Sequence, residues 1–208
     1  MNGHGRGVGM KNVMFASITT DFEKSLAEIF TREGYGVCNA QTLEETFAQP
    51  IEYLIDTTDY RDVLDTFTLT EGINATMIEQ VLRKNVFTSM ALLERFLPLL
   101  DAGLEKRLFY ISSAMASMNE TFDTKGYAYK MAKAALHQFL QMTWTKLTPS
   151  GYTLRLFDPM CGDVPPQQAA ASAFYYITRR RGMENDDGRR DDENNLIMRD
   201  ALGRVHGW

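Results

Sequence analysis

Short apolar segments alternate with segments of helical periodicity along this chain, and this alternation constrains the fold more than any other feature. An apolar strand predicted over 12–17 leads into an amphipathic helix with Phe22, Leu26, Ile29 and Phe30 on one face. Strands separated by helices pair readily in parallel, because the crossing helix returns the chain to the same edge of the sheet. We therefore expect an α/β fold with a mostly parallel sheet and helices on both faces. The other predicted strands cover 35–39, 51–56, 107–112, 152–157 and 195–200, and the other predicted helices cover 42–49, 77–100, 127–147 and 166–181.

The whole chain has the length and composition of one globular domain. Its 208 residues are 44% apolar and 24% charged, and the net charge of −5 gives no reason to expect nucleic acid as a partner. No apolar run is long enough to cross a bilayer. Cys38 and Cys161 lack CxxC spacing, which favours a reduced cytoplasmic setting without a structural metal. We expect a flexible tail over 1–11 and a single domain over 12–208.

The stretch YAYKMAKAAL at 127–136 carries the strongest chemical signal. Tyr129 and Lys133 are four residues apart, so a helix places both side chains on one face. A lysine ammonium beside a phenol favours the phenolate, which lowers the phenol pKa toward the range where it exchanges protons with a substrate oxygen. Because the same spacing is common on ordinary exposed helices, the surroundings of the pair decide its meaning.

Two further polar residues supply those surroundings. Ser113 follows the predicted strand LFYIS, and Asn85 lies in the long helix that precedes this strand. Together with YAYKMAKAAL and the closing DALGRVHGW, they resemble the short-chain dehydrogenase/reductase family. The resemblance is strongest to a branch that includes the C-factor signalling protein and small carbonyl reductases. It extends from about Val13 to Trp208 and implies a Rossmann-like, doubly wound parallel sheet with three α/β/α layers.

The resemblance also implies a catalytic tetrad of Asn85, Ser113, Tyr129 and Lys133. In the family, the tyrosine is the general acid/base and the serine hydroxyl holds the substrate oxygen. The lysine lowers the tyrosine pKa, and the asparagine holds a water in a proton relay. All four residue types stand at the matching positions here, so the resemblance implies these roles for this chain.

The turn that would bind the cofactor departs from the family pattern. The glycines of the family's T-G-x-x-x-G-x-G turn fall on Ser17, Asp21 and Glu23, and the two carboxylates would repel a diphosphate. The sequence TDFE at 20–23 instead has the spacing of a capping box, in which Thr20 and Glu23 satisfy each other's backbone amides. Asp21 in the first turn also suits the helix dipole. We expect a helix end that satisfies its own donors.

Three further departures affect the same half of the site. The family's P-G after the sixth strand becomes Pro159-Met160, and only 35–50 separates the first helix from the strand at 51–56. We therefore expect one strand–helix unit to be missing, so that the sheet lacks an outer strand beside 35–39. The family's N-N-A-G motif is replaced by Asp56, Thr57, Thr58 and Asp59.

Three functions remain open from the sequence. The first is proton transfer on a small carbonyl or hydroxyl compound without a nicotinamide, of isomerase, lyase or cyclase type. The second is a non-catalytic subunit paired with an active reductase, and the third is a carbonyl reductase that holds NAD(P) in an unusual way. We expect no cofactor and no metal. We also expect a homo-oligomer or a heteromer built on 77–97 and 127–147, with His137 on the surface, at that interface or facing the cleft.

Overall fold

The computed structural model describes residues 10–44, 46–61, 72–120, 125–179 and 195–207. Within these ranges the chain forms one mixed sheet whose strands follow the order β2-β1-β3-β4-β5-β6-β7. The strands are β1 (Asn12–Phe15), β2 (Gly36–Asn39), β3 (Tyr53–Asp56), β4 (Arg107–Ile111), β5 (Thr153–Asp158), β6 (Met198–Asp200) and β7 (Val205–His206).

The sheet is parallel from β2 to β6, as the alternation of strands and helices predicts. Only β7 runs antiparallel, because a tight turn at Gly203 (φ +79°) folds it back onto β6. The sequence did not predict this strand. The described sheet has seven strands, because β7 adds one at this end. At the other end β2 is the last described strand, so the described residues place no strand beside 35–39, where the loss of one was expected.

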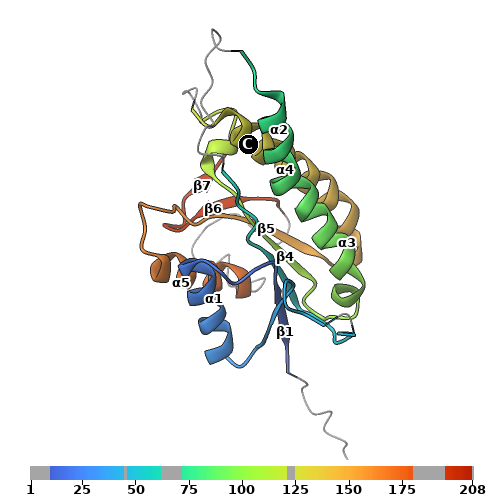
Figure 1. The fold of residues 1–208 in the computed structure, drawn as a ribbon. Helices are drawn as coiled ribbons and strands as arrows, with labels where there is room; N and C mark the ends of the chain where they lie inside the picture. The colour runs from blue at the N-terminus through green and yellow to red at the C-terminus, as the bar shows by residue number, and fades with distance from the viewer. Residues whose placement is uncertain (1–9, 45, 62–71, 121–124, 180–194, 208) are drawn as a thin grey trace, which may run out of the picture.

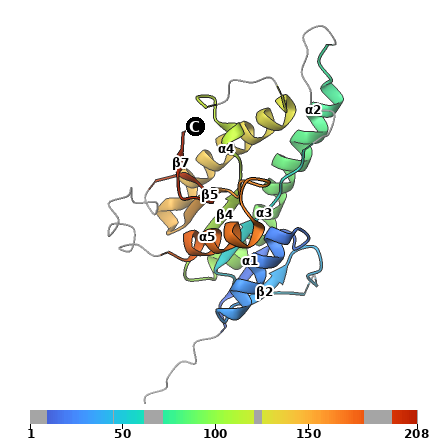
Figure 2. The ribbon, with the colours of Figure 1, turned by 90° about the vertical axis from the view of Figure 1, so that its left-hand side faces the viewer.

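Helices cover both faces of the sheet, so the fold has three α/β/α layers (Figure 1). On one face, α1 (Asp21–Arg32) packs along α5 (Pro166–Thr178), and Figures 1 and 2 both show these two helices together. On the other face, α2 (Ala75–Leu82) and α3 (Thr88–Asp101) lie beside α4 (Tyr127–Leu147). Two apolar cores result, one on each side of the sheet.

The predicted helix over 77–100 is continuous but not uniform. A π-helical turn, Arg83–Phe87, joins α2 to α3. Such turns insert an extra residue per turn and frequently occur at functional sites. Asn85 lies inside this turn and is fully buried.

One predicted helix is wrong and one prediction concerns residues that are not described. The segment 41–50 forms turns in place of the helix expected over 42–49, with position 45 outside the described residues. Here Leu43 and Phe47 pack against the core, and Asn39 accepts a hydrogen bond from the Gln41 amide, which starts a turn. Eight residues are too few to form a stable helix without tertiary support.

The predicted tail over 1–11 lies mostly outside the described residues, and the C-terminal Trp208 lies wholly outside them.

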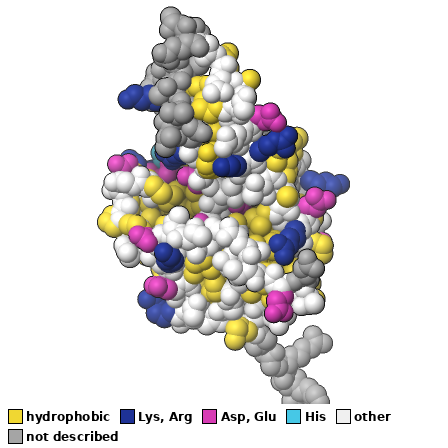
Figure 3. Space-filling view, viewed as in Figure 1, with side chains coloured by type: hydrophobic (Ala, Val, Ile, Leu, Met, Phe, Trp, Pro, Cys, Tyr) yellow, Lys and Arg dark blue, Asp and Glu magenta, His cyan; other side chains and the backbone are white. Residues whose placement is uncertain are grey.

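Two observations describe the surface of the described residues. None of the described helices is long and apolar enough to cross a membrane. On the face shown in Figure 3, acidic and basic side chains alternate around the rim and do not gather into one patch of a single sign. This distribution is consistent with the small negative net charge of the whole sequence.

Candidate active-site cleft

A large cavity opens at the carboxyl ends of the central strands. Its volume is about 1320 Å³, and its wall includes segments that directly follow β1, β3 and β5. In open α/β sheets this edge is where ligands bind, because the loops there diverge to opposite faces. The polar and charged side chains on the wall are Ser17, Thr19, Thr20, Asp21, Glu23, Gln41, Thr57, Thr58, Asp59, Thr88, Arg95 and Asp163.

The start of α1 has the predicted capping box. The Thr20 hydroxyl accepts a hydrogen bond from the Glu23 amide at 3.2 Å, and the Glu23 carboxylate accepts one from the Thr20 amide at 2.8 Å. The same carboxylate also accepts hydrogen bonds from the Thr19 amide at 2.7 Å, the Thr19 hydroxyl at 3.0 Å and the Ser17 hydroxyl at 2.8 Å. Glu23 is therefore bound by backbone amides at a helix N-terminus, where an anion is favoured.

The electrostatics of Glu23 agree with this geometry. Burial by itself would raise the pKa of its carboxyl group, but hydrogen bonds from the Thr57 side chain, the Thr20 and Thr19 amides and the Ser17 hydroxyl lower it overall. Glu23 is thus held ionised although only 3% of the residue is exposed. The sequence predicted the cap, but not that Ser17, Thr19 and Thr57 would also donate to the Glu23 carboxylate.

Tyr129 and Lys133 meet below the cavity, on one face of α4 as their spacing predicts. Lys133 Nζ donates to the carbonyl oxygens of Thr58 at 2.9 Å and Ile111 at 3.2 Å. It lies 5.6 Å from the centre of the Tyr129 ring. These contacts fix the ammonium between the ends of β3 and β4.

Asp59 occupies the centre of this group. The Tyr129 hydroxyl donates to Asp59 Oδ1 at 2.6 Å, and Lys133 Nζ forms an ion pair with the same oxygen at 3.1 Å. Arg61 donates to the Tyr129 hydroxyl oxygen at 3.2 Å, stacks over the ring at 4.3 Å, and lies 3.7 Å from Asp59 Oδ2. The sequence singled out Asp59 only as part of a replaced motif, and it gave no signal for Arg61.

The pKa of Tyr129 is shifted opposite to the expectation. Burial and the Asp59 carboxylate raise this pKa, and the Arg61 guanidinium only partly offsets them. The Lys133 ammonium was expected to lower this pKa, but Asp59 pairs with that ammonium and also accepts a hydrogen bond from the phenol. Tyr129 is therefore a protonated phenol at neutral pH.

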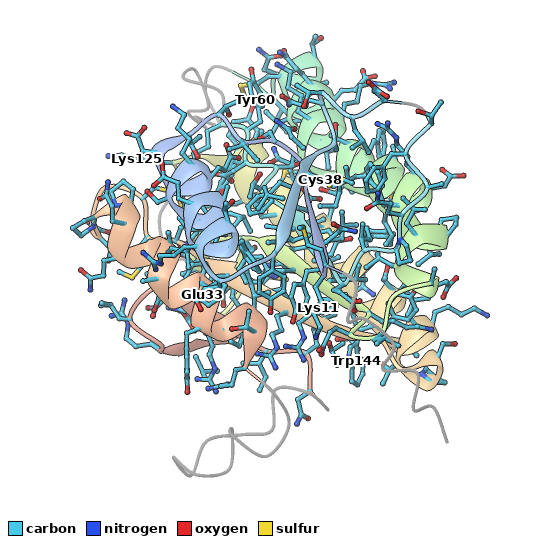
Figure 4. The ribbon with its side chains drawn as sticks, turned by 90° about the horizontal axis from the view of Figure 1, so that it is seen from below. Lys11, Glu33, Cys38, Tyr60, Lys125 and Trp144 are labelled. Carbon is cyan, nitrogen blue, oxygen red and sulfur yellow. The ribbon has the colours of Figure 1, made fainter. Side chains whose placement is uncertain are left out.

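Asn85 supports the group of Asp59, Tyr129 and Lys133 by binding the backbone of Tyr60. Its side chain donates to the Tyr60 carbonyl at 2.8 Å and the Val81 carbonyl at 3.0 Å, and accepts from the Tyr60 amide at 3.0 Å. Figure 4 shows Tyr60 near the helices of this face, and its ring lies 3.8 Å from Lys84 Nζ. The amide of Asn85 thus anchors the residue between Asp59 and Arg61. Its expected role of holding a water stays a prediction.

The two serines after β4 have different partners. Ser113 Oγ accepts a hydrogen bond from the Met115 amide at 3.3 Å, which caps a short 3₁₀ turn. Ser112 Oγ lies 2.5 Å from His137 Nε2, and both residues are buried. Burial, with the nearby Lys133 charge, lowers the pKa of His137 to about 4, so this histidine is neutral. His137 therefore lies in the interior, not on the surface or in the cleft as expected.

The tetrad residues are close to the cavity but do not form its wall. Among the described residues that line it, Asp59 is present and the four tetrad residues are not. Only 1% of Tyr129 is exposed, whereas 26% of the Asp59 side chain is. Asp59 therefore separates the Tyr129–Lys133 pair from the cavity. The described residues also contain no group of three or more His, Cys, Asp or Glu side chains that could hold a metal.

Comparisons with known proteins agree with the fold and with the sequence resemblance. No protein-family model matches the chain. C-signal from Myxococcus xanthus is 30% identical over 101 residues, which is 49% of this chain and 52% of C-signal, so the match spans about half the length of that relative.

Solved structures match over more of the chain. A carbonyl reductase from Pseudomonas aeruginosa PAO1 in complex with NADP superimposes with a TM-score of 0.71, at 15% identity, over 96% of this chain and all of that one. An oxidoreductase of the short-chain dehydrogenase/reductase family from Brucella ovis, in complex with a partially ordered NAD, gives a TM-score of 0.61 at 12% identity. That match covers 82% of this chain and 94% of the other. The chain therefore has the fold of the short-chain dehydrogenases/reductases.

Proposed function

We propose that this protein transfers a proton to or from a small carbonyl or hydroxyl compound in the cleft, without a nicotinamide cofactor. The reaction is of isomerase, lyase or cyclase type, so nothing is oxidised or reduced overall. The observation that carries the proposal is the hydrogen bond of 2.6 Å between the Tyr129 hydroxyl and Asp59, with Lys133 on the same oxygen. A protonated phenol, a carboxylate and an ammonium together form an acid–base group that needs no cofactor.

The cofactor half of the cleft supports the proposal, because its residues do not fit a dinucleotide. The amides of Thr19 and Thr20, which would face a diphosphate, already bind the Glu23 carboxylate. A diphosphate would have to displace a buried anion from four hydrogen bonds, and Asp21 would remain beside it. Two like charges about 4 Å apart repel by about 1 kcal/mol even in water, and by more where water is partly excluded.

In this proposal each residue has a defined task. Asp59 leaves the Tyr129 hydroxyl, whose hydrogen bond it accepts, so that the substrate oxygen can approach. Tyr129 then gives its proton to the substrate oxygen while the freed Asp59 carboxylate takes a proton from the neighbouring carbon, and both protons are returned when product forms. Lys133, fixed by the Thr58 and Ile111 carbonyls, stabilises the phenolate left between these steps.

A nucleotide titration tests the absence of a cofactor. We expect NADH and NADPH at about 1 mM to leave the Tm unchanged, whereas a ligand at 100 times its Kd would stabilise the fold by about 2.7 kcal/mol. The Pseudomonas aeruginosa carbonyl reductase, whose structure holds NADP, is the positive control. A rise in Tm with NADPH would instead favour a carbonyl reductase that holds NAD(P) in an unusual way. Solved structures of similar fold that contain NADP make this function the alternative.

An exchange experiment tests the chemistry. A panel of small ketones and 2-oxo acids is incubated with the protein in D₂O, and deuterium uptake next to the carbonyl is followed by proton NMR. We expect the wild type to accelerate uptake for at least one compound and Tyr129→Phe to lose about 100-fold of that rate. If the wild type and Tyr129→Phe are equally inert, the burial of Tyr129 would identify a non-catalytic subunit instead.

A further inference from the structure

We propose that the Asp59 carboxylate fills a binding site for an anionic oxygen, and that the compound bound in this cleft is a small carboxylate that takes its place. The proposal that the substrate is a carboxylate rests on the proposed function and makes that function more specific. No sequence motif indicates a carboxylate ligand. The indication comes from the structure, in which the carboxylate of Asp59 occupies the donors.

Three donors converge on this one carboxylate. Oδ1 accepts from the Tyr129 hydroxyl at 2.6 Å and from Lys133 Nζ at 3.1 Å, and Oδ2 lies 3.7 Å from Arg61 Nε. A phenol, an ammonium and a guanidinium form the kind of donor set that recognises a carboxylate. The set is also rigid, because Lys133 is held by two backbone carbonyls and Asn85 holds the intervening Tyr60.

Access to these donors depends on Asp59. Tyr129 and Lys133 are buried, and the Asp59 side chain lies on the cavity wall between them and the open volume. Asp59 is in the loop after β3 and is the residue of this group that lines the cavity. Among the described residues, a ligand that enters from the cavity therefore meets the Asp59 carboxylate first, and it takes the place of this carboxylate to reach Tyr129 and Lys133.

Charge decides which ligand can make this exchange. If Asp59 moves away, the Lys133 ammonium loses its ion-pair partner while its side chain stays fully buried. An unpaired buried charge is strongly unfavourable, so an uncharged ketone or alcohol is a poor replacement. A carboxylate replaces the lost charge and pairs with Lys133 and Arg61, so that the Tyr129 hydroxyl is left to donate to a carbonyl oxygen of the same molecule. The site thus selects an anionic oxygen, and a 2-oxo acid satisfies this requirement while carrying a carbonyl for proton transfer.

The test removes the internal carboxylate and supplies an external one. Asp59→Ala is titrated with sodium acetate and with acetamide, its uncharged isostere, at constant ionic strength, and the Tm and the acetate NMR line width are measured. We expect acetate to bind Asp59→Ala at least tenfold more tightly than acetamide does. Asp163→Ala is the matched control, because it removes another carboxylate from the same cavity wall. It should show no preference for acetate.

Two further variants keep the test decisive. Asp59→Ser leaves a small polar side chain and is used if Asp59→Ala does not fold, with the same expected result. Adding Lys133→Met to the Asp59 variant should abolish acetate binding. Equal affinity for acetate and acetamide, or acetate binding that survives Lys133→Met, would overturn the proposal. Its failure is distinct from that of the proposed function, because the NADPH titration uses the wild type and does not involve Asp59.

Discussion

Glu23 lies at the first turn of α1 and directs its carboxylate back onto the backbone amides that precede the helix. Asp59, 36 residues later, directs its carboxylate onto the Tyr129 phenol and the Lys133 ammonium in a similar way. In both places a side chain of the protein supplies the negative charge that the surrounding donors require. In the two proposals above, these single residues decide which ligands the cleft accepts.

Replacing Glu23 tests how much the internal anion stabilises the helix end. Glu23→Ala leaves the Thr19 and Thr20 amides and the Ser17 hydroxyl without their acceptor, so we expect about 1–3 kcal/mol of lost stability in urea unfolding at pH 7. Thr20→Ala should cost about 1 kcal/mol. The control Asp21→Ala removes an exposed carboxylate from the same turn and should cost about 0.5 kcal/mol.

The stability lost in Glu23→Ala should depend on pH in a definite direction. The pKa of Glu23 is lower in the folded chain than its ordinary value of 4.5, so its stabilisation is complete above that value. This stabilisation is lost as pH falls through the lowered folded pKa. The stability difference between wild type and Glu23→Ala should therefore shrink on acidification below 4.5. A difference that grows on acidification would contradict the assignment.

Among the secondary-structure elements, α5 ends against the sheet in an unusual way. Arg155 on β5 and Arg107 on β4 are buried, and their guanidinium groups donate to the carbonyl oxygens at the end of this helix. The last carbonyls of a helix lack intrahelical partners and carry partial negative charge, so buried cations there satisfy both needs. The contact also ties one helical layer to two central strands.

Replacing Arg155 tests this contact. Arg155→Met keeps the length of the side chain but removes its bonds to the Tyr176 and Arg179 carbonyls. Because hydrogen bonds to charged groups contribute about 1.5–3 kcal/mol each, we expect a loss of about 3 kcal/mol or more in chemical unfolding. Arg32→Met, at the exposed end of α1, is the matched control and should change stability by less than about 0.5 kcal/mol. Equal effects for the two variants would refute the capping role.

The β6–β7 hairpin is held by a histidine between two carboxylates. His206 lies 2.8 Å from Glu120 and 3.1 Å from Asp200. Burial alone would lower the pKa of His206, but its hydrogen bonds to Glu120 and Asp200 raise it above 6.5. The sequence carried no specific signal for this residue.

The raised pKa predicts a pH-dependent stability of opposite sign to that of Glu23. The contribution of His206 is fully present below the pKa of the unfolded chain and is lost as pH rises through the raised folded value. We expect His206→Gln to lower the Tm most on the acid side of 6.5 and least in alkaline buffer. Glu120→Gln should reduce the same pH dependence. A Tm difference independent of pH would show that His206 is not charged in the fold.

For the whole molecule, the described surface leaves large apolar side chains on the helical layer formed by α2, α3 and α4. Phe87, Met131 and Met142 are each at least 50% exposed and lie on the helical segments from which we expected an interface. Apolar side chains on neighbouring helices are typical of surfaces that another chain covers. Association through this layer stays a prediction.

Light scattering at tens of micromolar concentration tests the predicted association through this helical layer. We expect a homodimer, and we expect Met131→Glu combined with Phe87→Glu to give a monomer with nearly unchanged Tm, because neither side chain is in the core. The control Leu104→Glu changes an 87% exposed residue outside these helices and should leave the dimer intact. A monomeric wild type that also recovers no partner in a pull-down would contradict the prediction.

The sequence by itself determined the features that depend on near neighbours along the chain. The capping box of Thr20 and Glu23, the shared face of Tyr129 and Lys133, and the alternation of strands and helices were all predicted and are all found. Helical contacts at three- and four-residue spacing and apolar periodicity are local, so residue order specifies them directly. The helix expected over 42–49 failed, since its residues pack against the core instead of each other.

Only the tertiary structure decided which distant side chains meet. Asp59 and Tyr129 are 70 positions apart. They touch because β3 and β4 are adjacent in the sheet and the first turns of α4 lie at their carboxyl ends. The burial of His137, the carbonyl acceptors around Arg155 and the carboxylates around His206 have the same origin. Pairing across such separations depends on strand order and packing, which no local pattern specifies. The sequence therefore placed Tyr129 and Lys133 on one helix face, and the fold decided that Asp59 would contact both.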